Sequence, residues 1–377
     1  MKRKLAGFIR CAVLVLVLVL SVGCFPMVTT KPDDGKAPGI PSLREIYQDY
    51  FEIGAAVSIA GWSSKTIDTH QDLIKKHFSS LTAENEMKPD ALQPRQGQFN
   101  FSDGDKMVDF ALSNGMKVRG HTLVWHAQTP DWFFKDKDGN RIDKKDVITD
   151  EDRQLVIERL ENHIETVMTR YAGKVYAWDV VNEAISDDGR YILRQDSPWF
   201  RILGEDFIEI AFRKAHEVDP TAKLFYNDYN IERVYKRGRT IQMLKSLLDK
   251  GVPIHGVGIQ GHWSVNDSIE EVEQAIKMYA DLGLEIHITE LDIGIKDVSE
   301  ASLARQAEYY RKVFAMFKKY SDVITSVTLW GISDQATWRP NDNPLLFDKN
   351  KEPKPAFWAI VDTDKSWEEN KALYLGL

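Results

Sequence analysis

From residue 43 onward the chain alternates short apolar segments with longer amphipathic ones. Most of the apolar segments are nearly continuous, which is typical of parallel strands covered on both faces. Eight such strands alternating with helices predict an α/β fold, either a closed (β/α)8 barrel or a doubly wound open sheet. The predicted strands lie at 53–60, 78–85, 117–125, 175–183, 223–230, 256–263, 285–293 and 324–331.

Three amphipathic segments carry helix-end signals. Residues 102–115 begin at a capping Ser and end at Gly115. Residues 268–283 have Ser268 at the N-cap, Glu271 as the partner of a capping box, and Gly283 at the end. Residues 301–320 carry their basic residues late, where they complement the helix dipole. We therefore predict helices over these three ranges.

Polar or aromatic residues stand at the end of almost every predicted strand. An open sheet gathers its chemistry at one switch point, whereas a barrel collects it from the carboxyl ends of many strands. This distribution favours the (β/α)8 TIM barrel, formed as one domain. The residues concerned are Glu84 and Asn85, His121 and Trp125, Asn182 and Glu183, Asn227 and Tyr229, Gln260 and His262, Glu290 and Asp292, and Trp330.

The N-terminal residues are typical of an export signal. A basic start is followed by the apolar stretch 11–22, which is too short to span a bilayer. The following "VGC" resembles the site at which bacterial lipoproteins are cleaved and lipidated, here on Cys24. We expect a signal peptide at 1–23, a Pro-rich tether at 24–42 and a catalytic domain at 43–377. The protein is then exported and lipid-anchored at the outer cell surface, or simply secreted if the signal is an ordinary one.

Composition narrows the chemistry further. The chain has 377 residues, 43% of them hydrophobic, which is enough for a large core. Its net charge of −8 argues against a nucleic-acid surface. Its two cysteines both fall in the first 24 residues, so no disulfide framework or cysteine metal site is expected in the folded part. Motifs for zinc peptidases, serine hydrolases and P-loop enzymes are absent, and we expect neither metal nor cofactor.

The stretch "HGVGIQGH" (255–262) contains the pattern G-x-G-x-x-G. A dinucleotide loop needs these glycines to open a helix, but here they lie inside a predicted strand. With a period of two, Gly256, Gly258, Gln260 and His262 share one face, which points into the barrel. The glycines then leave room in the interior, while the two polar side chains reach the mouth and need partners there.

Glu183 and Glu290 end two apolar strands in similar settings, so both are drawn toward low dielectric. Hydrolysis of an acetal needs one carboxylic acid and one carboxylate on either side of the bond. The alternative is that one or both glutamates are ion-paired structural acids. Trp125, Trp330 and Trp338 lie at or just past strand ends, where they can stack on sugar rings or, alternatively, pack in the core.

Seven segments together resemble glycoside hydrolase family 10, whose members are mainly endo-1,4-β-xylanases. The resemblance covers about Ser42 to Asp362. It implies retaining endo-hydrolysis of xylan through a covalent intermediate, with xylan and xylo-oligosaccharides as ligands. We expect a monomer that contacts a membrane only through its lipid. The segments are "LTAENEMK" (81–88), "GHTLVWH" (120–126), "WDVVNE" (178–183), "NDYNIE" (227–232), "GIQGH" (258–262), "ITELDI" (288–293) and "WGISDQATW" (330–338).

The resemblance also implies roles for individual residues. Glu183 matches the general acid/base and Glu290 the nucleophile, while His262 and Asp292 support the nucleophile and Asn182 contacts the sugar 2-hydroxyl. Pro89 stands where the family often has an aromatic residue, so the resemblance does not define the shape of the distal glycone subsite. The remaining matches bind substrate: Glu84, Asn85, Lys88, His121, Trp125, Tyr229, Gln260, Trp330 and Trp338.

Two other functions stay open at this point. One is a broader β-1,4-glycanase that acts on both cello- and xylo-oligosaccharides. The other is a non-catalytic, glycan-binding surface lipoprotein on the same scaffold, although such a binder has no need for both glutamates.

Overall fold

The computed structural model describes residues 39–60 and 65–377. The predicted signal peptide, Cys24 and most of the tether lie outside these residues. Within them, no helix is long and apolar enough to cross a membrane.

Nine strands of the described residues form one parallel sheet in the order β6-β5-β4-β3-β2-β1-β9-β8-β7, and pairing of β6 with β8 closes it into a barrel. This confirms the (β/α)8 prediction and excludes the open sheet. The strands are β1 (Glu52–Val57), β2 (Ser80–Ala83), β3 (Lys117–Trp125), β4 (Ala177–Asn182), β5 (Lys223–Asp228), β6 (Gly256–Ile259), β7 (His262–Ser264), β8 (Glu285–Gly294) and β9 (Ile324–Leu329).

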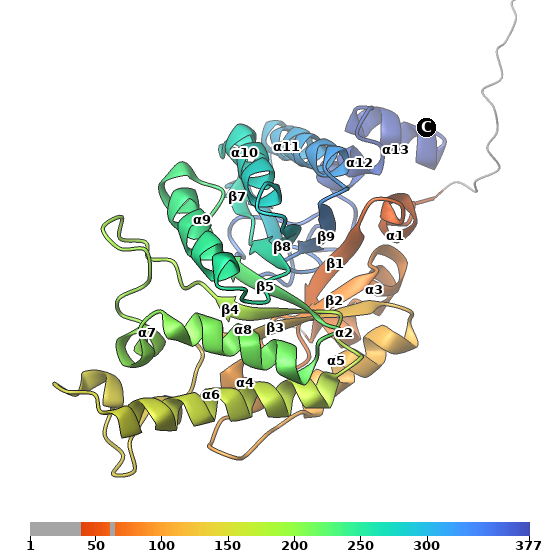
Figure 1. The fold of residues 1–377 in the computed structure, drawn as a ribbon. Coiled ribbons are helices and arrows are strands. Elements are labelled where there is room, and N and C mark those ends of the chain that lie inside the picture. Colours follow the sequence, from red (N-terminus) through yellow and green to blue (C-terminus); the bar gives the residue numbers. More distant parts are fainter. Residues whose placement is uncertain (1–38, 61–64) are drawn as a thin grey trace, which may run out of the picture. The chain divides into compact units, whose positions relative to one another are not determined.

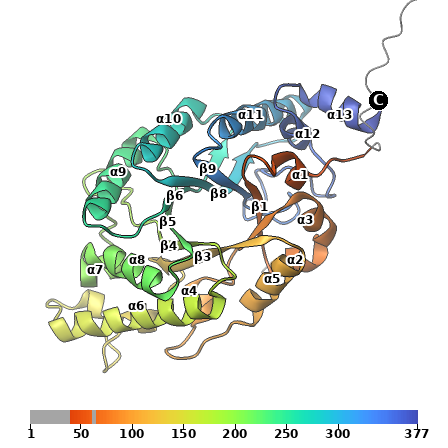
Figure 2. The ribbon, with the colours of Figure 1, turned by 45° about the vertical axis from the view of Figure 1, so that its right-hand side comes forward.

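The helices of the described residues form a ring outside the strands (Figures 1 and 2). Short 3₁₀ turns lie at Asp131–Phe134 and Ile142–Lys144. The α-helices are α1 (Leu43–Tyr47), α2 (Thr66–Thr69), α3 (Gln71–His77), α4 (Pro89–Leu92), α5 (Ser102–Ser113), α6 (Asp150–Tyr171), α7 (Pro198–Leu203), α8 (Asp206–Val218), α9 (Val234–Asp249), α10 (Ile269–Ala280), α11 (Glu300–Lys319), α12 (Pro355–Val361) and α13 (Trp367–Leu375).

The predicted N-cap of α10 is confirmed, whereas its capping box and the predicted N-cap of α5 are wrong. Ser268 caps α10 by accepting the Glu271 N–H at 3.2 Å, as predicted. The reciprocal bond of a capping box, from the Ser268 N–H to the Glu271 carboxylate, does not form. The Ser268 hydroxyl also donates to the Glu270 carboxylate at 2.9 Å. In α5 the N-cap is Phe101, and Ser102 is already inside the helix.

The predicted sixth strand divides into β6 and β7. Gly261 has φ +83°, a left-handed conformation that interrupts the strand between Ile259 and His262. Sequence periodicity cannot show this break, since the apolar and polar positions continue through it. Gln260 and His262 still both reach the barrel mouth.

The glycines of β6 make room in the barrel, as predicted. A Cβ at Gly256 would collide with the Phe225 ring and lie 2.6 Å from the Glu285 carbonyl oxygen. A Cβ at Gly258 would overlap Asn227 Oδ1 and lie 2.8 Å from Thr289 Cγ2. These positions therefore exclude any larger residue without movement of their neighbours.

We predict that Gly258→Ala lowers the free energy of unfolding by about 1–3 kcal/mol, because the added methyl overpacks the barrel interior. Gly238, inside α9, is a matched control, since a Cβ there meets nothing within 4 Å. Gly238→Ala should be neutral or stabilising by up to about 1 kcal/mol through helix propensity. Urea denaturation of both variants measures the difference, and equal stabilities would contradict the predicted crowding.

Candidate active site

A cleft of about 510 Å³ opens at the carboxyl ends of the strands. The strand register brings their ends level: Trp125 pairs with Asn182, and Asn182 pairs with Asn227. Every site residue predicted for the described part of the chain lines the cleft except Asp292, which is buried behind His262. The lining residues are Glu84, Asn85, Lys88, His121, Trp125, Gln128, Asn182, Glu183, Tyr229, Asn230, Gln260, His262, Glu290, Trp330 and Trp338.

Glu183 stands at the end of β4 with φ +57°, a left-handed conformation that is uncommon for a residue with a side chain. Trp125 Nε1 donates to one carboxyl oxygen at 2.9 Å, and Gln260 Nε2 donates to the other at 2.8 Å. Burial raises the pKa of Glu183, and the charges of Asp228 and then Glu290 raise it further. These influences outweigh the two hydrogen bonds, so Glu183 tends to keep its proton.

Glu290 in β8 has the opposite tendency. Burial by itself raises its pKa, but the hydrogen bond from His262 and the nearby His121 lower it to a net value below the ordinary one. Asn227 Nδ2 also donates to Glu290 Oε1 at 2.9 Å. Within the cleft, the pKa of Glu183 is therefore shifted toward the acid form and that of Glu290 toward the carboxylate.

His262 lies between two carboxylates. Its Nε2 is 3.2 Å from Glu290 Oε2, and its Nδ1 is 3.0 Å from Asp292 Oδ2. Burial alone would lower the pKa of His262, but Asp292 and Glu290 raise it to about 10. Asp292 is held in turn by Arg339, at 2.5 Å, and by Trp338 Nε1, at 2.8 Å. The predicted contact of His262 with Glu290 is therefore confirmed.

Two further groups of contacts shape one side of the cleft. Lys88 Nζ donates to Asn85 at 3.0 Å and to Gln128 at 2.9 Å, and it lies 5.1 Å from the centre of the Trp125 ring. His121 Nδ1 is 2.8 Å from Asp179 Oδ2, and its ring meets the Trp330 ring edge to face. The cleft thus combines fixed polar groups with aromatic faces, as a sugar-binding site requires.

Several residues at the site were not predicted to have a role there. Asn227 donates to both Asn182, at 2.8 Å, and Glu290, and its place at a strand end was the signal that could have found it. Gln128 and Asn230 line the cleft from loops, where periodicity gives no signal. Arg339 acts on Asp292 from a distant segment, which no local pattern indicates.

The described residues do not meet the requirements of a metal site. In residues 39–60 and 65–377, no group of three or more His, Cys, Asp and Glu side chains is arranged to hold a metal ion. The acidic and basic side chains of the cleft instead bond to each other and to neighbouring amides and indoles.

A parallel barrel whose mouth holds one carboxyl group with a raised pKa beside one with a lowered pKa is typical of glycoside hydrolases. Residues 42–363 match the family model described as glycosyl hydrolase family 10. This protein belongs to that family and is a glycoside hydrolase. The matched range agrees with the resemblance predicted over Ser42 to Asp362.

Curated relatives and solved structures cover most of the chain. A β-1,4-xylanase of Dictyoglomus thermophilum is 47% identical over 93% of this chain and 98% of its own length. An endo-1,4-β-xylanase of Geobacillus stearothermophilus is 47% identical over 86% of this chain and 98% of its own. The crystal structure of an endo-1,4-β-xylanase from Caldicellulosiruptor owensensis superimposes with a TM-score of 0.79 at 48% identity, covering 86% of this chain and 100% of that one.

We predict that His262 remains a doubly protonated imidazolium well above neutral pH, because carboxylates accept from both of its nitrogens. Its pKa rises from 6.5 to about 10 on folding. The charge therefore contributes stability fully below pH 6.5, and this contribution is lost as the pH rises toward 10. Nitrogen-15 NMR of the ring reports the titration directly. A midpoint near 6.5 in the folded protein would contradict the prediction.

Proposed function

We propose that this protein is an endo-acting 1,4-β-xylanase that retains the configuration of the anomeric carbon. The opposite pKa directions of Glu183 and Glu290 in one cleft carry the proposal. Retaining hydrolysis needs an acid and a nucleophilic carboxylate at the same time. The curated relatives are named as xylanases, which indicates xylan as the substrate class.

In the first step the Glu290 carboxylate attacks the anomeric carbon of the bound sugar. Glu183 gives its proton to the glycosidic oxygen as the bond between that oxygen and the anomeric carbon breaks. The charge on His262 and the bond from Asn227 hold the Glu290 carboxylate in place. The product is an ester between the sugar and Glu290, and the leaving chain departs with a hydroxyl group.

In the second step water attacks the anomeric carbon and the ester bond breaks. The esterified Glu290 no longer carries a negative charge, so one of the influences that raise the Glu183 pKa is removed. Glu183 is then the base that accepts a proton from water. Glu290 leaves as a carboxylate and Glu183 is protonated again, which restores the starting state.

The other residues of the cleft bind and orient the chain. We assign Asn182 to the sugar 2-hydroxyl, where a hydrogen bond strengthens in the transition state. Tyr229 provides an aromatic face on the aglycone side. The remaining residues bind the glycone side or line the centre: Glu84, Asn85, Lys88, His121, Trp125, Gln260, Trp330 and Trp338.

We predict release of reducing sugar from xylan, with the β-anomer formed first when the reaction is followed by NMR. Glu290→Gly should have no measurable turnover, because no nucleophile remains. Glu183→Ala should lose about 10²–10⁴-fold on xylan, which is the usual contribution of general acid–base catalysis.

The control uses an aryl glycoside with a good leaving group, which needs no proton in the first step. On this substrate azide should restore turnover to Glu183→Ala by replacing water as the nucleophile. Rescue of neither variant would contradict the retaining assignment. Equal activity on soluble cellulose would instead indicate a broader glycanase, and calorimetric binding of xylo-oligosaccharides without product would indicate a binding protein.

We also infer that the protein is exported and anchored through a lipid on Cys24, after cleavage of residues 1–23. The basic start, the apolar stretch 11–22 and "VGC" support this inference. We predict that Cys24→Ala moves the activity from the membrane fraction to the soluble fraction. Mass spectrometry of the mature N-terminus should find a lipidated Cys24, and an unmodified N-terminus elsewhere would overturn the anchor.

A further inference from the structure

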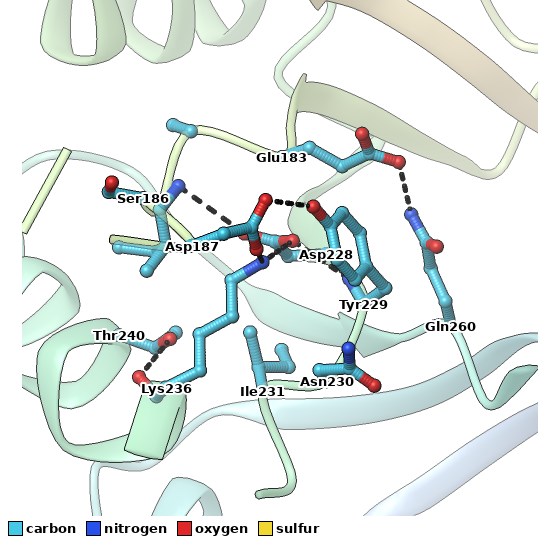
Figure 3. Close-up of polar contacts among 12 residues, drawn as sticks. Glu183, Ser186, Asp187, Asp228, Tyr229, Asn230, Ile231, Lys236, Thr240 and Gln260 are labelled. Atoms are coloured by element: carbon cyan, nitrogen blue, oxygen red, sulfur yellow. Dashed lines mark hydrogen bonds and ion pairs between the residues drawn. The ribbon is translucent and has the colours of Figure 1, made fainter. Parts of the chain in front are cut away.

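A buried ion pair lies beside the Glu183 turn and outside the cleft. Lys236 of α9 and Asp228 at the end of β5 are both fully buried, and Lys236 Nζ donates to Asp228 Oδ1 at 2.8 Å. Lys236 also lies 3.4 Å from Asp187 and 3.7 Å from the centre of the Tyr229 ring. Figure 3 shows Lys236 extending between the two aspartates, with Tyr229 beside its ammonium group. The pair thus connects the core to the cleft wall.

Asp228 accepts every one of its side-chain hydrogen bonds. Besides Lys236, it receives the Tyr226 hydroxyl at 2.5 Å, the Tyr229 N–H at 2.8 Å and the Ile185 N–H at 3.4 Å. Burial dominates and raises the pKa of Asp228 above its ordinary value, although the Lys236 charge and the bonds from Tyr226 and the Tyr229 N–H oppose the rise. The O–H of a protonated Asp228 would have no acceptor among these groups. We therefore assign the ionised form.

Tyr226 connects this carboxylate to the backbone after Glu183. Its hydroxyl accepts the N–H groups of Ala184, at 3.0 Å, and Ile185, at 3.1 Å, while it donates to Asp228. These are the two residues that follow Glu183, whose own φ is +57°. A left-handed conformation at such a residue is strained and persists only where the surroundings hold it.

A buried ion pair is not needed for stability as such. Replacing such pairs with apolar residues of similar volume is often neutral or stabilising. A fully buried Lys–Asp pair that bonds to the turn of the acid/base is therefore better explained by what it does to that turn. Asp228 also places its negative charge close to the Glu183 carboxyl group.

We propose that Asp228 and Lys236 are positioning residues for the Glu183 acid/base, with Asp228 fixing the Glu183 turn through Tyr226 and placing a negative charge beside that turn. The proposal rests on the role proposed above for Glu183. It extends that role to a carboxylate that does not line the cleft.

Other charged groups also face Glu183. Glu290 of β8 acts in the same direction as Asp228, and Asp228 has the larger effect on the pKa of Glu183. Lys88, which lies before α4, interacts favourably with the Glu183 charge. Arg194 Nε donates to the Glu183 carbonyl oxygen at 3.2 Å. Lys236 carries the opposite charge beside Asp228, so it opposes the effect of Asp228 on Glu183.

The test is Asp228→Asn, which keeps the shape and removes the charge. The alkaline limb of the kcat/KM profile reports loss of the Glu183 proton, and it should move to lower pH by roughly 1 unit, near the lower end of the effect of one neighbouring charge. Turnover at neutral pH should fall about 10-fold or more on xylan, which needs the acid. On an aryl xylobioside with a good leaving group, the first step should change little.

Two variants separate positioning from charge. Tyr226→Phe removes the hydroxyl that holds the Ala184 and Ile185 N–H groups but leaves Asp228 charged. It should lower kcat on xylan without moving the alkaline limb. Asp228→Asn combined with Lys236→Met removes both buried charges, so it keeps the test available if the single variant does not fold. The double variant should move the limb in the same direction but by less, because the Lys236 charge that opposes Asp228 is removed with it.

The chain offers a matched control in Lys354 and Asp334, a second buried Lys–Asp pair with a 2.8 Å contact. Asp334→Asn removes the same charge from another buried pair, which is not among the main influences on the Glu183 pKa. It should lower stability and leave the alkaline limb where it is.

Three outcomes would overturn the proposal. One is an unmoved limb in Asp228→Asn and in the double variant, and another is an equal loss on both substrates, which indicates a merely structural role. The third is a shift of the same size in Asp334→Asn. Failure of the Glu183 assignment is distinguishable, because Glu183→Ala would then show no azide rescue whatever Asp228 does.

Discussion

The burial of two carboxyl groups in one cleft is the constraint on which the rest of this site depends. Transfer of a carboxylate from water to low dielectric is costly, so each group must either keep a proton or gain compensating partners. Glu290 gains His262 and Asn227 and tends to ionise, while Glu183 receives only neutral donors and tends to remain an acid. Acid and nucleophile therefore differ by their partners, not by residue type.

The barrel makes this division possible because each strand end carries a different partner. Glu183 ends β4, Asn227 lies in β5, and Glu290 and Asp292 belong to β8. His262 begins β7, which pairs with β8 so that His262 lies opposite Asp292. Parallel register then brings side chains that are distant in the sequence into one hydrogen-bonded network, and rigid strands fix their geometry.

Much of this could be predicted from the sequence, because strand ends carry a clear local signal. Apolar runs followed by polar residues identified the barrel, and a period of two put Gln260 and His262 at its mouth. The break at Gly261 could not be predicted, since it depends on a backbone conformation. Nor could the effect of Asp228 on Glu183, because it arises from burial and through-space charge. Burial and the Asp228 charge both raise the Glu183 pKa more than the Glu290 charge does.

The most direct test of this division of charge is carbon-13 NMR of the glutamate carboxyl groups in the free enzyme, assigned with Glu183→Gln and Glu290→Gln. The account predicts that Glu290 titrates below its ordinary pKa of 4.5 and Glu183 above it. Titration of both groups together, or of Glu290 at the higher pH, would contradict it.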